Sequence, residues 1–146
     1  MAVDDLGYQG KDGLGDAVGI SDPDLSLIKP IHAVSALVKL AKENAGHLNI
    51  AALGPLTNIA LACRMDPLFG KNIKSLSAMG GNKHGKGNVT VSAEFNFAAD
   101  PEAARVVLQE MSSHVSLVTW ELCLEHPMEW DFFMSMLEEI VRSQNL

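Results

Sequence analysis

The chain has 146 residues, of which 47% are hydrophobic and 20% are charged, a composition typical of a globular domain with a sizeable core. Its net charge is −7 and its 11 lysines and arginines are scattered, which argues against a nucleic acid or an anionic membrane as the partner. No apolar run approaches membrane-spanning length, and the acidic N-terminus lacks a segment of signal-peptide type. Because Cys63 and Cys123 also lack metal-site spacing, we expect a reduced, cytoplasmic protein in which both cysteines are core residues.

Residues 1–30 show no sustained helical or strand period, so we expect an irregular loop segment there, within a single domain that covers residues 1–146. Calcium binding through the aspartates of this segment is an alternative. The EF-hand order of ligands, with its closing Glu, is absent, which favours a solvated loop. Residues 13–19 nearly match a dinucleotide fingerprint, but the final glycine is one residue late and no strand precedes it, so we reject a dinucleotide site.

From residue 31 onwards the pattern alternates between helices and short apolar strands. An apolar run at 48–53 is broken by a Gly-Pro turn and followed by a helix, which is the order of elements in parallel sheets. The sequence therefore predicts an α/β fold with an open, largely parallel sheet and flanking helices. The apolar stripe of residues 132–140 predicts core packing, and residues 120–127 predict a connection. The expected strands lie near 48–53, 74–79 and 115–119, and the expected helices near 31–45, 57–65, 101–110 and 130–142.

A glycine-rich loop follows the second expected strand, at residues 80–87. Gly80, Gly85 and Lys86 have the spacing of a phosphate-binding loop. Such a loop needs Ser or Thr next to hold magnesium and a helix that aims its N-terminus at phosphate, but Gly87 and a β-branched run follow. We therefore expect a flexible loop rather than a site for a nucleoside triphosphate.

Polar side chains then punctuate an apolar run. Glu94 and Asn96 are two residues apart, so on an extended backbone they would project from the same face, with Asn88 nearby. A carboxylate beside a carboxamide offers the donors and acceptors that a polyhydroxylated ligand such as a sugar needs. The alternative is that Glu94 and Asn96 satisfy the backbone of a loop. Asp100, with Pro101 after it, predicts the start of a helix.

These residues resemble the inosine-uridine preferring nucleoside hydrolase family, over roughly residues 7 to 130. Two long blocks match, in the order and at the separation found in the family, which makes the resemblance specific. The first block is Ala52-Leu53-Gly54-Pro55-Leu56-Thr57-Asn58-Ile59-Ala60-Leu61-Ala62, and the second contains Gly87-Asn88-Val89-Thr90, Ala93-Glu94-Phe95-Asn96 and Asp100-Pro101-Glu102-Ala103-Ala104.

The resemblance implies a ribonucleoside hydrolase, a glycosidase that cleaves the N-glycosidic bond of purine or pyrimidine nucleosides to base and ribose. It implies a small-molecule nucleoside as partner and a place in nucleoside metabolism, such as purine catabolism. Carried over by position, Asn88, Glu94 and Asn96 fall on substrate-binding residues that contact ribose. The family also uses calcium, and its backbone carbonyl ligand falls on Thr57. We expect all four residues to converge on one cleft at the strand ends.

The sequence also departs from the family pattern. Gln9 stands where the family has a histidine at the mouth of the active site, and the family's aspartate-rich calcium motif is absent. One carbonyl cannot hold calcium, which takes about six to eight oxygen ligands. We therefore expect an incomplete nucleoside hydrolase-like domain, a fragment that is inactive alone and retains no calcium. A non-catalytic domain that binds ribose or a nucleoside, or acts in an interaction, stays open, as do a homo-oligomer and the preferred base.

Overall fold

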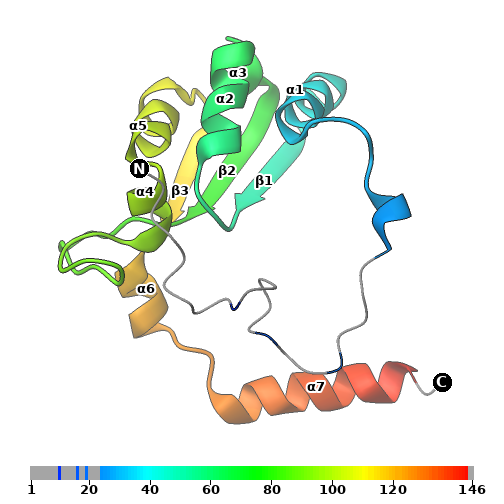
Figure 1. Ribbon diagram of the computed structural model, residues 1–146, viewed down its shortest axis with the longest axis vertical. Helices are drawn as coiled ribbons and strands as arrows, with labels where there is room; N and C mark the ends of the chain where they lie inside the picture. The colour runs from blue at the N-terminus through cyan, green and yellow to red at the C-terminus, as the bar shows by residue number, and fades with distance from the viewer. Residues whose placement is uncertain (1–9, 11–15, 17–18, 20–23, 145–146) are drawn as a thin grey trace.

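The computed structural model describes residues 10, 16, 19 and 24–144. Gln9, and with it most of the expected irregular segment, lies outside the described residues. The described chain forms a parallel three-stranded sheet in the order β1 (Leu48–Ala52), β2 (Ile73–Met79) and β3 (His114–Val118), as Figure 1 shows. The expected parallel α/β fold is confirmed, and each strand lies within about one residue of its expected position.

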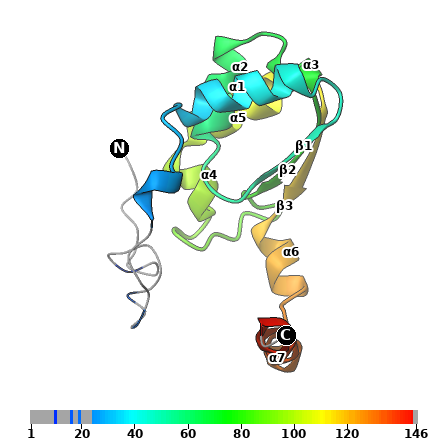
Figure 2. The same cartoon turned by 90° about the vertical axis from the view of Figure 1, so that its right-hand side faces the viewer.

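Helices cover one face of this sheet. Figure 2 shows α1 (Ala33–Glu43), α2 (Thr57–Met65) and α5 (Pro101–Glu110) on the same side of the strands, while no helix of the described residues lies on the opposite face of the sheet. The short α3 (Phe69–Asn72) and the 3-10 turn η1 (Leu25–Leu27) complete this part of the fold. No described helix is long and apolar enough to cross a membrane.

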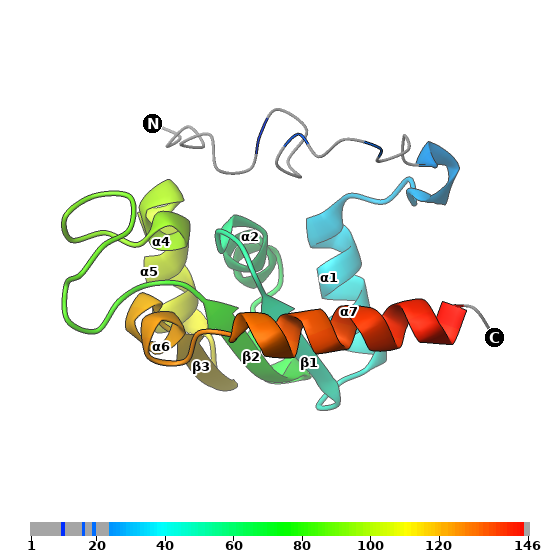
Figure 3. The ribbon, with the colours of Figure 1, turned by 90° about the horizontal axis from the view of Figure 1, so that it is seen from below.

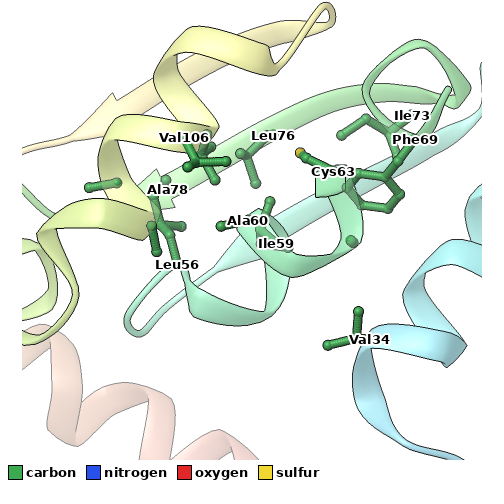
Figure 4. Close-up of a cluster of buried hydrophobic side chains, with 14 of the residues drawn as sticks. Val34, Leu56, Ile59, Ala60, Cys63, Phe69, Ile73, Leu76, Ala78 and Val106 are labelled. Atoms are coloured by element: carbon green, nitrogen blue, oxygen red, sulfur yellow. The ribbon is translucent and has the colours of Figure 1, made fainter. Parts of the chain in front are cut away.

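The core lies between β2 and the helical layer. From Leu76 to Met79 the side chains of β2 alternate between buried and exposed positions, because successive residues of a strand point to opposite faces. The buried Leu76 belongs to one cluster with Leu56 before α2, Phe69 of α3 and Val107 of α5, and Figure 4 labels Leu76, Leu56 and Phe69 in it. This single core fixes how β2 stands relative to the helices, and therefore where the segments after its carboxyl end begin.

Two segments differ from the sequence-based expectation. The backbone after Glu94 is helical rather than extended, because the Glu94 side chain caps α4 (Phe95–Ala99). The expected connection after β3 contains α6 (Trp120–Glu125), whose N-terminus the Thr119 hydroxyl caps by accepting from the Leu122 amide.

The C-terminal helix α7 (Trp130–Gln144) forms as expected, but its apolar stripe does not enter the core. Figure 3 shows α7 running across the carboxyl end of the sheet, outside the layer of helices. Phe132 is 56% exposed, Leu137 39% and Ile140 53%. The prediction of core packing for this stripe is therefore wrong: helical periodicity reports an amphipathic helix but not which surface covers it.

Candidate functional site

A small cavity opens at the carboxyl ends of β2 and β3, which is the edge of a parallel sheet where ligand sites form. Its volume is about 100 Å³. The end of β2 with the loop up to Glu94, and the end of β3 with α6, both contribute to it, so two segments that are distant in sequence form the cavity. Its lining residues are Met79, Gly80, Asn88, Glu94, Val118, Trp120 and Cys123.

Glu94 combines exposure to this cavity with a structural role. Its side chain is only 7% exposed. One carboxylate oxygen, Oε1, accepts from the Asn96 amide at 2.9 Å, and Oε2 accepts from the amides of Gly81 at 2.8 Å and Phe97 at 3.1 Å. These bonds start α4 and tie it to the loop after β2. Because a carboxylate has about four acceptor positions, Oε1 keeps capacity for one further donor.

The two asparagines have different surroundings. Asn88 is exposed, and its Oδ1 accepts from the Phe95 amide at 2.8 Å, which leaves its Nδ2 with no acceptor among the described residues. Asn96 is buried, and its Nδ2 donates to the Met79 carbonyl at 2.9 Å. Asn96 therefore fastens α4 to the end of β2 and is not among the residues that line the cavity.

Thr57 begins α2, directly after the turn that follows β1. Its hydroxyl donates to Asp100 Oδ2 at 2.6 Å, and Asp100 Oδ1 accepts from the Ala103 amide to cap α5. The Thr57 hydroxyl, followed by the Ala103 amide, holds the pKa of Asp100 below its usual value. Thr57 thus lies on the same edge of the sheet as Glu94, after the neighbouring strand, but outside the lining of the cavity.

The structure therefore brings Asn88 and Glu94 together in one cavity and places Asn96 and Thr57 beside it. Their assignment to ribose and calcium stays a prediction. Sequence reasoning did not single out Trp120, which lines the cavity, or Glu121, which holds the adjacent loop. Both follow directly after an expected strand, and that position at a carboxyl end is the signal that could have identified them.

Glu121 is the second buried carboxylate of the site, with 6% of its surface exposed. Its Oε1 accepts from the His84 amide at 2.7 Å and its Oε2 from the Lys83 amide at 2.9 Å. Burial raises the pKa of Glu121, but the His84 and Lys83 amides and further hydrogen bonds outweigh it, so the pKa falls to about 2. The group therefore carries a full negative charge at neutral pH.

The described residues do not fit a calcium ion. No group of three or more His, Cys, Asp or Glu side chains that could hold a metal occurs among them. The carboxylates nearest the cavity, on Glu94 and Glu121, already bind backbone amides, whereas calcium takes about six to eight oxygen ligands.

Comparison with known proteins agrees with this architecture. The family model described as inosine-uridine preferring nucleoside hydrolase matches residues 2–145. The chain belongs to this nucleoside hydrolase family. A solved structure described as an inosine-guanosine nucleoside hydrolase superposes with a TM-score of 0.77 at 36% sequence identity, over 87% of this chain and 41% of that one. The expected family resemblance is thus confirmed.

Among sequences, the chain is 42% identical over 98 residues to a protein named probable uridine nucleosidase 2 from Oryza sativa subsp. japonica. This match covers 67% of this chain and 29% of the rice protein. It is 45% identical over 93 residues to the pyrimidine-specific ribonucleoside hydrolase RihB of Escherichia coli, which covers 64% of this chain and 28% of RihB. The match therefore covers less than a third of the length of these two relatives.

Proposed function

We propose that this chain provides part of the ribose-binding surface of an N-ribosyl hydrolase, an enzyme that cleaves the N-glycosidic bond of a nucleoside. The observation that carries the proposal is that Asn88 and Glu94 line one cavity and that each side chain keeps an unused hydrogen-bonding position. Asn88 Nδ2 can donate to a ribose oxygen, and Glu94 Oε1 can accept from a ribose hydroxyl. A donor and an acceptor on one small cavity suit a sugar diol better than an apolar ligand.

The same groups suit the chemistry of bond cleavage. Cleavage of a glycosidic bond passes through a state in which the sugar ring carries positive charge. The Glu94 carboxylate is held in a buried position by three amides, so it would face that charge without having to reorient. Trp120 lines the same cavity, so its aromatic side chain would contact a ligand there. These residues would bind and orient ribose and stabilise developing charge.

The chain alone is proposed to release little or no ribose. Among the described residues near the cavity, the carboxylates of Glu94 and Glu121 hold backbone amides, and no group of three or more metal-binding side chains accompanies them to activate water. A second candidate is a non-catalytic domain that binds ribose or a nucleoside. It is favoured by the extent to which Glu94 and Asn96 serve the backbone of α4 and β2.

The proposed function includes a ligand and a cellular compartment. A nucleoside is the proposed partner, in the cytoplasm, and the names of similar proteins include both uridine-directed and inosine- and guanosine-directed hydrolases. Assays with purine and pyrimidine nucleosides therefore test the preferred base and a place in purine catabolism. Sedimentation or light scattering tests whether the protein forms a homo-oligomer.

The test uses the purified chain with inosine and uridine, with and without calcium. We expect ribose binding in the absence of ordinary turnover, and we expect Asn88→Ala to weaken binding by roughly tenfold, the value of one hydrogen bond of about 1 kcal/mol or slightly more. Asn49→Ala is the matched control, because Asn49 lies in β1 near the opposite end of the sheet. No ribose binding at all would contradict the proposal, and calcium-dependent turnover unaffected by Asn88→Ala would contradict both the inactivity and the site.

A further inference from the structure

The loop that carries Asn88 is held by a residue on a different segment. We propose that Glu121 is a positioning residue, which fixes the loop of residues 80–93 against α6 and thereby sets where Asn88 lies at the cavity. The consequence for ribose binding rests on the proposed function, whereas the effect on the loop does not. Figures 1 and 3 show this loop, between β2 and α4, beside α6.

The first step is the attachment itself. Lys83 and His84 are exposed residues near the start of the loop, yet both of their backbone amides donate to the buried Glu121 carboxylate, at 2.9 Å and 2.7 Å. Hydrogen bonds to a charged acceptor are stronger than those between neutral groups. Successive backbone amides can bind an anion such as phosphate. In this chain the anion that binds the Lys83 and His84 amides is the Glu121 side chain of α6.

The second step connects the attachment to Asn88. Asn82 precedes the two bound amides, and its Nδ2 donates to the carbonyls of Lys86 at 3.2 Å and Ser92 at 2.8 Å, which cross-links the two arms of the loop. Beyond Ser92, the Phe95 amide donates to Asn88 Oδ1 and so ties Asn88 to the end of the loop. A shift of the near arm is therefore passed through Asn82 to the segment that orients Asn88.

Glu94 alone does not fix the position of this loop. Glu94 holds Gly81, at the base of the near arm, at 2.8 Å. Asn88 lies seven residues beyond Gly81, and most residues between them are exposed. The Gly81 carbonyl also accepts from the Trp120 amide at 3.0 Å, so the base of the near arm is held at Gly81 from two sides. Glu121 supplies a second fixed point at Lys83 and His84, because bonds at one residue leave the segment free to pivot there, whereas two separated attachments define its direction.

The test compares wild-type chain with Glu121→Ala and Glu121→Gln by NMR of the backbone amides and of the asparagine side-chain amides. The matched control is Glu125→Ala, since Glu125 is an exposed glutamate on the same helix. In Glu121→Ala we expect the Lys83 and His84 amides, the Asn88 side-chain amide and the Phe95 amide to shift, with smaller shifts of the same signals in Glu121→Gln. The control leaves all four unchanged. Shifts confined to Lys83 and His84 would overturn the proposal.

Two further measurements keep the outcome decisive. If Glu121→Ala does not fold, hydrogen exchange of the wild-type chain decides: the Lys83 and His84 amides must exchange more slowly than the amide of Lys86, which has no acceptor among the described residues. Equal exchange rates overturn the proposal. In a titration with D-ribose, we expect roughly tenfold weaker binding by Glu121→Ala and no change in Glu125→Ala.

The two proposals fail separately in this titration. If wild-type chain binds no ribose, the proposed function fails, while the NMR signals of Asn88 and Phe95 still decide the role of Glu121. If wild-type chain and Glu121→Ala bind ribose equally, the positioning of the site by Glu121 is overturned, while the proposed function stands.

Discussion

Replacement of Glu94 should separate its structural role from its role toward a ligand. The Glu94 carboxylate accepts from three amides, and two of these bonds are buried. In Glu94→Gln one carboxylate oxygen becomes an NH₂ group, which cannot accept a hydrogen bond. If the NH₂ group takes the place of Oε1, the bonds from Gly81 and Phe97 to the remaining oxygen are kept and only the bond from the Asn96 amide is lost. One buried amide therefore loses its acceptor, at a cost of about 2 kcal/mol. Glu94→Ala removes both acceptor oxygens, and with them all three hydrogen bonds and the cap of α4, and we expect a loss of roughly 3–5 kcal/mol.

Urea denaturation of the purified chain, followed by circular dichroism, measures both values. Glu139→Gln is the control, because Glu139 is exposed on α7 and its replacement should change the free energy of unfolding by less than about 0.5 kcal/mol. The loss in the free energy of unfolding should be largest for Glu94→Ala, smaller for Glu94→Gln and smallest for Glu139→Gln. If Glu94→Gln unfolds at the same urea concentration as wild type, the bonds of Glu94 do not stabilise the fold and our account of its geometry is wrong.

Two other expectations follow from the same site. The pKa of Glu121 falls from an ordinary 4.5 to about 2 in the folded chain, so the stabilising contribution of this carboxylate is fully present above pH 4.5 and is lost as the pH falls toward 2. The stability of Glu121→Gln should therefore not show this loss between pH 4.5 and pH 2. Identical acid unfolding curves for the variant and the wild type would contradict this expectation. Gly81→Ala should lower the melting temperature more than Gly85→Ala. Both glycines have positive φ, +71° and +67°, but only at Gly81 would a new Cβ lie 2.9 Å from the Phe97 ring, whereas at Gly85 it meets nothing within 4 Å. Equal shifts would show that the contact with Phe97 adds no cost.

The regular elements of this protein could be predicted because their signals are local. The apolar runs of β1, β2 and β3 and the break at Gly54-Pro55 lie within short windows of sequence, and so do the cap and first residue of α5 at Asp100 and Pro101. The polar residues that the family resemblance selects were also identifiable, since they lie within a few residues of one another.

The partners of those residues could not be predicted in the same way. The sequence reasoning considered Glu94 on an extended backbone, and only the fold brings the Gly81 amide, 13 residues away, to its carboxylate and makes it the cap of α4. The bond between Glu121 and His84 joins residues 37 positions apart. The stripe of α7 was read correctly as helical and wrongly as core.

The physical reason is the range over which each interaction is decided. Backbone geometry and side-chain periodicity determine whether a segment becomes a helix or a strand, and these act over a few residues. Which amide a buried carboxylate binds, and which face an amphipathic helix covers, depend on how β2, β3 and their helices pack into one core. The sequence by itself therefore determined the family, the sheet and the candidate polar residues of this protein. Only the tertiary structure decided that Asn88 and Glu94 share a cavity and that Glu121 holds the loop beside it.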